Sequence, residues 1–169
     1  MMPQFLDVDS PVGTLRLVAE SGALVRLELR PGPRARALRR GWAEDAGAAP
    51  FAAVTAQLRE YFAGGRRAFD VPLDLRGTAF QRQVWQALCE IPHGETRSYG
   101  EIAARIGSEG GSRAVGLANH ENPVPLIVPC HRVINADGTL GGFGGGVELK
   151  RWLLRHEGAE AAAQSALPW

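Results

Sequence analysis

The sequence is poor in cysteine, in long apolar runs and in net charge. Its 169 residues include only two cysteines, Cys89 and Cys130, which are too few for a disulfide framework. Neither has histidine partners at the spacing of a four-ligand metal site. Apolar stretches such as residues 124–128 are too short to cross a bilayer, and residues 1–10 lack the pattern of a signal peptide. We therefore expect a cytoplasmic protein with no metal, no membrane span and no structural disulfide.

Excess positive charge is also missing. The 19 basic residues are balanced by 18 acidic ones, which leaves a net charge of +1. This balance excludes the dense positive field of a protein that holds DNA through phosphate contacts alone. Lys150 is the only lysine, and arginine suits planar or forked contacts better than lysine does. Any contact with nucleic acid must therefore be local.

The sequence does contain enough apolar residues, 45%, to bury a core in one domain or two small lobes. Alternating apolar residues over 14–29 predict a β-hairpin, and the spacing over 51–62 predicts a helix. Strict alternation over 69–75 predicts a strand. Residues 31–49 are aperiodic, which favours a loop whose arginines form a solvated surface rather than a nucleic-acid patch. These arginines are Arg34, Arg36, Arg39 and Arg40.

The pattern changes near residue 77. Thr78 with Gln81 forms a capping box, and Ser98 with Glu101 forms a second one, each leading an amphipathic helix. The predicted fold class is therefore α/β (α+β), a small mixed N-terminal lobe with an antiparallel sheet followed by a mainly helical C-terminal lobe. The predicted segments are residues 1–76, 77–158 and a tail over 159–169.

A helix-turn-helix is predicted in the second lobe. The helix led by Ser98 ends at Gly107, and after a glycine-bearing turn Ser112 is expected to cap a second helix over 113–120. Ordinary cores also contain such pairs. The second helix carries three small residues, which suit either close approach to a DNA groove or close packing against another helix. They are Ala114, Gly116 and Ala118.

The segment that ends at Cys130 has the composition of a rigid nucleophile site. Three prolines within residues 122–129 fix the backbone, and His131 follows the thiol directly and is a candidate base. Glu157 follows a predicted helix and is a candidate partner for that histidine if the helix folds back. The alternative is an inert, buried thiol. Cys89 lies in an amphipathic pattern and is expected to be core filler.

The glycine run over residues 141–146 matches no dinucleotide fingerprint, and no strand-helix unit surrounds it. We interpret it as a loop whose backbone approaches a flat ligand. A methyltransferase that uses a bound donor cofactor is therefore not favoured, because no motif for the cofactor is found.

The motif Pro129-Cys130-His131-Arg132-Val133, preceded by residues 122–125, resembles the signature of the O6-alkylguanine-DNA alkyltransferases. The resemblance covers roughly residues 78–158, with matches at Ser98-Tyr99, residues 112–116, 152–154 and 156–158. It implies single-turnover DNA repair without a cofactor. An alkyl group would pass from the O6 atom of guanine, or the O4 atom of thymine, in double-stranded DNA to Cys130 of a monomeric protein.

The resemblance also implies roles for individual residues. His131 would act through a water as the base for Cys130, and Glu157 would hold that histidine. Asn122 would brace the turn, Tyr99 would donate a proton or hydrogen bond to the guanine, and Arg113 would fill the gap left by the flipped base. Further DNA contacts are expected from Ser112, Ala114, Gly116, Gly100 and Ser108. The expected base pocket comprises Val133, Phe143 and Gly144.

Two positions depart from the family. Phe143 stands where a tyrosine is usual, and Gly144 stands where several members carry a side chain, so the pocket is expected to be wider. Some members bind zinc in the first lobe, but no cysteine precedes Cys89, so no metal is expected. Two alternative functions are considered. A cysteine hydrolase would use Cys130, His131 and Glu157 as a Cys-His-Glu triad. A non-catalytic alkyltransferase-like protein would bind the lesion without transfer, but those proteins carry tryptophan in place of Cys130.

Overall fold

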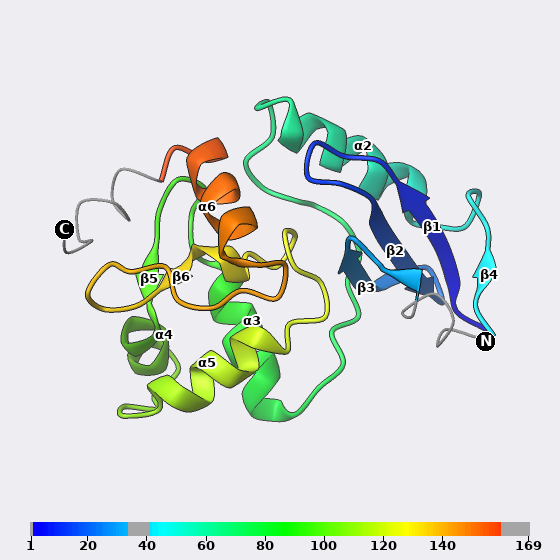
Figure 1. Cartoon of the computed structure of the whole chain (residues 1–169). Coiled ribbons are helices and arrows are strands. Elements are labelled where there is room, and N and C mark those ends of the chain that lie inside the picture. The colour runs from blue at the N-terminus through cyan, green and yellow to red at the C-terminus, as the bar shows by residue number, and fades with distance from the viewer. Residues whose placement is uncertain (1, 34–40, 160–169) are drawn as a thin grey trace. The chain divides into compact units, whose positions relative to one another are not determined.

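The structure, a computed structural model, describes residues 2–33 and 41–159 and divides into two compact units between Arg76 and Gly77 (Figure 1). The four arginines of the predicted loop and the predicted tail beyond Ala159 lie outside the described residues. Within the described part, none of the helices combines the length and the apolar character needed to span a membrane. The mixed α and β fold predicted for the chain is confirmed.

The N-terminal unit is built on a four-stranded sheet of order β3-β2-β1-β4. β1 (Gln4–Val8), β2 (Leu15–Glu20) and β3 (Ala23–Leu29) are antiparallel neighbours, and the short β4 (Ala43–Glu44) runs parallel to β1. The predicted hairpin is therefore confirmed as β2 and β3. Its turn places Ser21 and Gly22 at positive φ, 52° and 81°, which is the backbone geometry that favours a tight hairpin.

One helix, α2 (Phe51–Phe62), follows the sheet as predicted. Its buried side chains recur at helical spacing and form the core of this unit with strand residues such as Leu15 and Leu17, all at most 3% exposed. Full burial of each large apolar side chain stabilises the fold by about 1.5–3 kcal/mol. The buried helix residues are Phe51, Val54, Leu58 and Tyr61.

The strand predicted over residues 69–75 is wrong. The segment is extended, and its alternation is real, because Phe69, Val71, Leu73 and Leu75 are half-buried between exposed neighbours. It nevertheless forms only a single bridge, in which Leu24 donates to the Pro72 carbonyl at 2.9 Å and accepts from the Asp74 amide at 3.0 Å. Pro72 has no amide hydrogen, so the ladder cannot continue through it.

Between Gly77 and Ala159, the described part of the C-terminal unit holds four α-helices: α3 (Ala79–Cys89), α4 (Tyr99–Arg105), α5 (Ser112–His120) and α6 (Val147–His156). A 3-10 turn, η1 (Cys130–Arg132), leads into β6 (Val133–Ile134), which pairs in parallel with β5 (Arg97–Ser98). In Figure 1, α3, α4 and α5 gather on one side of this small sheet and α6 lies beside η1. The helical lobe thus surrounds the turn that carries Cys130.

Both predicted capping boxes are present. Thr78 Oγ1 accepts from the Gln81 amide at 3.1 Å, and Ser98 Oγ accepts from the Glu101 amide at 3.1 Å. The predicted cap at Ser112 is wrong, because α5 begins at that residue and no side chain caps it. The chain reaches α5 through a tight glycine turn that leaves no extended residue to act as the cap.

Cys89 is exposed, which corrects its prediction as buried core. The buried face of α3 is centred on Leu88, with Val84 and Trp85 beside it. Because successive helical residues are about 100° apart, Cys89 is turned away from that face at the last position of the helix. It therefore contributes little to the core.

Candidate active site

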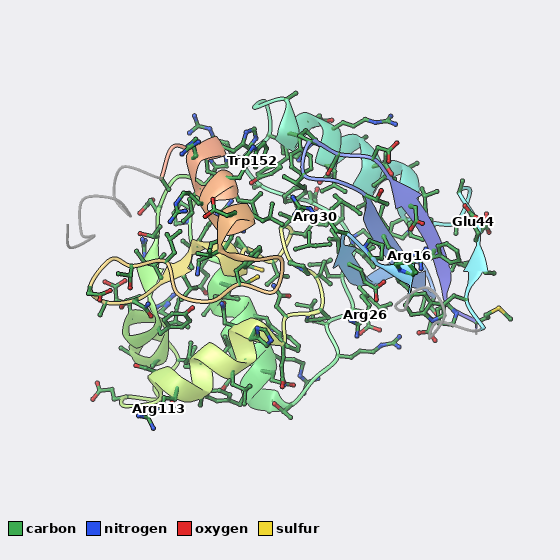
Figure 2. The ribbon with its side chains drawn as sticks, viewed as in Figure 1. Arg16, Arg26, Arg30, Glu44, Arg113 and Trp152 are labelled. Atoms are coloured by element: carbon green, nitrogen blue, oxygen red, sulfur yellow. The ribbon has the colours of Figure 1, made fainter. Side chains whose placement is uncertain are left out.

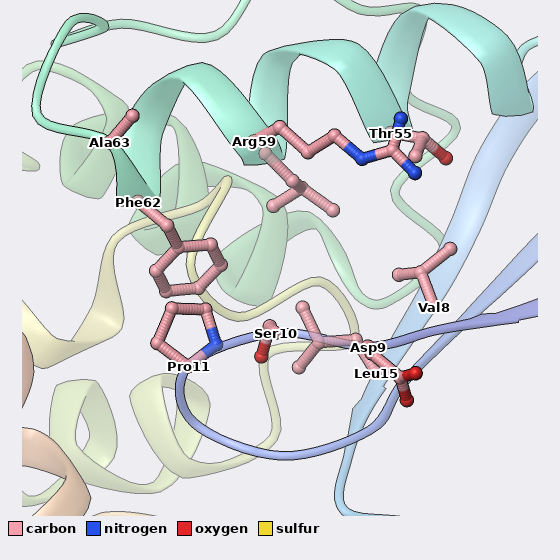
Figure 3. A pocket seen from close by; sticks show the side chains of 10 residues that line it. Val8, Asp9, Ser10, Pro11, Leu15, Thr55, Arg59, Phe62 and Ala63 are labelled. Carbon is pink, nitrogen blue, oxygen red and sulfur yellow. The ribbon is translucent and has the colours of Figure 1, made fainter.

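A pocket of about 330 Å³ lies in the N-terminal unit between the β1–β2 loop and α2 (Figure 3). Its polar groups come from Asp9, Ser10, Thr55 and Arg59, and its lining includes no cysteine and no histidine. Within residues 2–33 and 41–159, no group of three or more histidine, cysteine or acidic residues is placed to hold a metal ion. The residues with nucleophile and base chemistry gather instead around Cys130.

The backbone that presents Cys130 is fixed at several points. Asn122 accepts from the Val124 amide at 2.9 Å and donates to the Val128 carbonyl at 2.8 Å, so one side chain closes both ends of the proline-rich segment. The Cys130 amide donates to the Val128 carbonyl at 2.8 Å, and Asn119 Nδ2 donates to the Cys130 carbonyl at 3.3 Å. These hydrogen bonds hold the backbone at Cys130 in one position, as a reactive side chain requires.

The Cys130 thiol is almost completely buried, at 5% exposure. Burial raises its pKa to about 11, although a hydrogen bond from Asn122 and the charge of Lys150 act in the opposite direction. The free thiol is therefore the resting form at neutral pH. Formation of a thiolate requires a base nearby.

His131 and Glu157 form a buried pair that is suited to this task. His131 Nε2 lies 2.7 Å from Glu157 Oε1, and both side chains are fully buried. A carboxylate can only accept hydrogen bonds, so the imidazole proton sits on Nε2 and the lone pair on Nδ1. Nδ1 has no hydrogen-bond partner among the described residues. Burial lowers the pKa of His131 despite the opposing effect of Glu157, which leaves a neutral imidazole able to accept a proton.

Arg132 completes the network from the other side. Its Nε and Nη2 donate to the two Glu157 oxygens at 2.8 and 3.0 Å, and its Nη1 donates to the Ile91 carbonyl at 2.7 Å. Burial opposes ionisation of Glu157, but the hydrogen bonds and charges of His131 and Arg132 hold its pKa well below the usual range. Glu157 is thus a carboxylate at neutral pH, as the assigned tautomer of His131 requires.

Lys150 is a second buried cation near the thiol. Its Nζ donates to the Val133 carbonyl at 2.6 Å and to the Gly142 carbonyl at 3.4 Å, and the residue is 0% exposed. Burial lowers its pKa to about 8, while the charge of Cys130 acts to raise it. Lys150 therefore links α6 to β6 and to the glycine loop, and it places positive charge where a thiolate would form.

Tyr99 lies between this cluster and α5. Burial and then the charge of Cys130 raise the pKa of its phenol, so the hydroxyl keeps its proton at neutral pH. A Cβ atom on Gly141 would lie 3.2 Å from the Tyr99 hydroxyl, and Gly141 has φ of 72°, so glycine is needed for this close approach. The Tyr99 ring also lies next to Gly116 of α5, where a Cβ would meet it at 3.8 Å.

The helix pair exposes most of the residues expected to contact DNA. Ser112, Arg113 and Ala114 are exposed at the start of α5. Gly100 is exposed on α4, and Ser108 is half-buried in the turn, where its carbonyl accepts from the Gly111 amide at 2.8 Å.

The small residues of α5 serve two different purposes. Ala118 is 3% exposed, and its carbonyl accepts from Trp85 Nε1 at 2.9 Å, so this residue packs α5 against α3. Ala114 is exposed and Gly116 is half-buried. Close helix packing therefore explains one of the three small residues, and the outward surface of α5 retains the others.

The three residues expected to line the base pocket differ in their exposure to solvent. Val133 is fully buried in β6, directly after η1. Phe143 is half-buried and Gly144 is exposed, and both lie in the loop before α6. The Gly142 carbonyl of this loop contacts Lys150, so the loop adjoins the Cys130 cluster at that point.

Two family models together match most of the chain. Residues 79–159 match the family model of the 6-O-methylguanine DNA methyltransferase DNA binding domain, and residues 7–75 match that of its ribonuclease-like domain. The methylated-DNA--protein-cysteine methyltransferase of Mycobacterium tuberculosis (strain ATCC 25618 / H37Rv) is 50% identical over 166 residues, which cover 98% of this chain and 99% of the relative. The chain belongs to the 6-O-methylguanine DNA methyltransferase family. The family predicted from the Cys130 motif is therefore confirmed.

Other members of this family agree. The methylated-DNA--protein-cysteine methyltransferase of Methanosarcina acetivorans is 46% identical over 151 residues, 89% of this chain and 96% of the relative. The crystal structure of Mycobacterium tuberculosis OGT in complex with DNA superposes with a TM-score of 0.85 at 48% identity, covering 95% of this chain and 99% of that one. The similarity thus includes the N-terminal unit, which lies outside residues 78–158, the part of the chain covered by the resemblance of the sequence motifs.

Three residues of the site were not singled out from the sequence: Asn119, Arg132 and Lys150. Arg132 stands inside the quoted motif, but its partner Glu157 is 25 positions away. Lys150 did carry a usable signal. It is the only lysine, and it occupies a position on the apolar face of α6 with Leu149, Leu153 and Leu154. A lone cation in that register indicates a buried charge with a specific partner.

Proposed function

We propose that this protein repairs DNA by direct reversal, moving the alkyl group of an O6-alkylguanine onto Cys130 in one irreversible event. One observation supports this most strongly. A buried, rigidly held thiol lies beside the His131–Glu157–Arg132 network in a chain that is 50% identical to a methylated-DNA--protein-cysteine methyltransferase over nearly its full length. The same chemistry would extend to O4-alkylthymine, which also carries its alkyl group on an oxygen.

In the proposed step, Cys130 transfers its proton through a water to Nδ1 of His131, which is the free acceptor of the buried pair. The thiolate sulfur then forms a bond to the alkyl carbon as the bond from that carbon to O6 breaks. Glu157 stabilises the imidazolium, and the charge of Lys150 stabilises the thiolate. The electron pair of the broken bond stays on O6, and the proton removed from Cys130 balances the proton that the guanine takes up, so the products are a thioether and a restored, neutral guanine.

The leaving guanine needs a proton or a hydrogen bond at the position where negative charge develops. Tyr99 fits this role, because its phenol stays protonated and its pKa responds to the charge on Cys130. Val133, Phe143 and Gly144 would line the base pocket, and Asn122 would keep the thiol in place. No step in this balance consumes a cofactor.

The target base must leave the duplex before O6 can reach a buried thiol. We assign the binding of double-stranded DNA to the helix-turn-helix formed by α4 and α5, through Gly100, Ser108, Ser112, Ala114 and Gly116. Arg113 would enter the gap, because a planar guanidinium can stack and bond with the orphaned base. Support comes from the exposure of Arg113 and from the DNA complex of the Mycobacterium tuberculosis relative.

A cysteine hydrolase uses the same three groups, but it must release its product by attack of water on a thioester. A thioether offers no such release, so the proposed repair consumes one protein per lesion. All groups of the site come from one chain, so we propose that the protein acts as a monomer, and we place it in the cytoplasm.

Intact-mass measurement tests the proposal. The protein is mixed with a duplex that carries one O6-methylguanine, and we expect one added methyl group, located on Cys130 by peptide mapping. An excess of substrate should yield no second addition. Catalytic turnover on an ester, or an unmodified protein after the duplex has been bound, would contradict the proposal.

A further inference from the structure

One large apolar side chain stands in solvent on α5. Leu117 is 61% exposed, and within the described residues the other large hydrophobic side chains with high exposure are Met2 and Val147, both outside the helix pair. Isolated exposed apolar residues are common in soluble proteins, so exposure alone assigns no role. The position of Leu117 on the helix is what makes it informative.

Leu117 shares the outward face of α5 with Arg113. Residues three and four apart on a helix are neighbours, so Leu117 adjoins both Ala114 and Arg113, about 6 Å further along the axis than Arg113. The opposite face of α5 is buried through Val115, Ala118 and Asn119. Arg113 points away from the ribbon at the start of the helix (Figure 2). The leucine is therefore one turn behind the residue that we propose enters the duplex.

The surface of α5 between Arg113 and Leu117 carries only small residues, whereas the exposed His120 and Glu121 lie on the other side of Leu117, toward the end of the helix. Ser112 and Ala114 are exposed and small, and Gly116 has no side chain. When such a face approaches a duplex closely enough for Arg113 to enter it, a projecting leucine one turn away is covered too. The deoxyribose rings are the apolar part of the DNA backbone, and they suit a branched aliphatic side chain that can neither bond to a base edge nor pair with a phosphate.

We propose that Leu117 packs against the deoxyribose rings of the strand next to the extruded nucleotide and adds an apolar, sequence-independent contact to duplex binding. The inference rests on the proposed function. It implies that the affinity for duplex depends on the size of the side chain at position 117. The salt dependence of binding should not depend on that side chain, because an apolar contact releases no counterion. The rate of the chemistry at Cys130 should not depend on it either.

The test uses Leu117→Ala with two readouts. Affinity for an O6-methylguanine duplex is measured in a Cys130→Ser background at several salt concentrations, and the single-turnover rate with the free base O6-benzylguanine is measured with Cys130 intact. We expect duplex binding to weaken about tenfold, with the salt slope and the free-base rate unchanged. Leu117→Met should restore binding. Val147→Ala, which removes an exposed apolar side chain from α6, is the matched control and should change neither readout.

Several results would overturn the inference. Unchanged duplex affinity would show that Leu117 is not covered by DNA. Equal losses in duplex affinity and in the rate with the free base would show that Leu117 stabilises the fold instead. A change in salt slope would show that its effect passes through phosphate contacts. If the wild-type protein takes no methyl group from the duplex, the proposed function fails and the inference fails with it. If the wild-type protein repairs the duplex and Leu117→Ala binds it equally well, the inference alone is refuted.

Discussion

Replacing Glu157 with glutamine would remove the negative charge at the centre of the buried network while keeping its shape. The carboxylate accepts one hydrogen bond from His131 and two from Arg132, at 2.7, 2.8 and 3.0 Å. Glutamine offers one acceptor oxygen and one NH2 group. Whichever way the amide is turned, its NH2 group faces a donor of His131 or Arg132, so at least one buried hydrogen bond is lost.

The expected loss of stability follows from the burial of the partners. Removing one partner of a buried ion pair typically costs 3–5 kcal/mol, because the remaining charge is left uncompensated. Arg132 keeps its bond to the Ile91 carbonyl, so we expect a loss near the lower end, about 3 kcal/mol. The reaction should slow by a factor on the order of 10² to 10⁴, since the proton of His131 is no longer held on Nε2.

Two measurements test this expectation. Urea unfolding at pH 7 gives the stability change, and single-turnover alkylation by O6-benzylguanine gives the rate without any contribution from DNA binding. Glu148→Gln is the matched control, because Glu148 lies in the first turn of α6, the helix that Glu157 caps, is 83% exposed in its side chain and forms a surface pair with Arg151 at 2.8 Å. Its loss should stay below about 0.5 kcal/mol. If Glu157→Gln behaves like Glu148→Gln in both assays, the assigned network is refuted.

The pH dependence provides an independent signature. The pKa of Glu157 is depressed in the fold, so its contribution is fully present above its ordinary value of 4.5 and is lost as the pH falls below it. The pKa of His131 is also lowered by burial, so below 6.5 the unfolded chain binds the proton first and stability falls further. Glu157→Gln should therefore flatten the loss of stability below about pH 4.5 but retain the loss that begins near 6.5.

Substitutions at four further positions test the roles of the thiols, of the helix pair and of the buried lysine. Cys130→Ser should abolish alkyl transfer with duplex binding nearly intact. Cys89→Ser should change neither transfer nor stability, because Cys89 is exposed. Intact mass measures transfer, duplex titration measures binding and urea unfolding measures stability. Arg113→Ala should slow repair of duplex strongly and reaction with O6-benzylguanine very little, with partial rescue by lysine; equal losses in the two single-turnover rates would mean that Arg113 supports the pocket. Lys150→Met should raise the pKa of Cys130 further above about 11, measured by thiolate absorbance in a Cys89→Ser background; an unchanged or lowered pKa contradicts the assigned charge effect.

Elements specified by local interactions were predictable from the sequence. The capping boxes at Thr78 and Ser98 act over three residues, and each marks the start of its helix correctly. The strand over residues 69–75 was not predictable, because alternation reports which side chains face the core and not whether a partner strand can bond through Pro72. Ser112 likewise has a residue type suited to capping, but the preceding glycine turn decides where α5 begins.

The two buried cations show where prediction of the site stops. The motif brings Cys130, His131 and Arg132 together because they are consecutive, yet the function of Arg132 depends on Glu157, which only the folding of α6 against η1 brings within 2.8 Å. Lys150 is carried to the site by the same packing, which buries one face of α6 and takes its single lysine with it. Burial of an ammonium is tolerated only where carbonyl groups or an anion compensate it. The contacts of Lys150 with the Val133 and Gly142 carbonyls therefore fix the position of the glycine loop relative to Cys130, which no spacing in the sequence specifies.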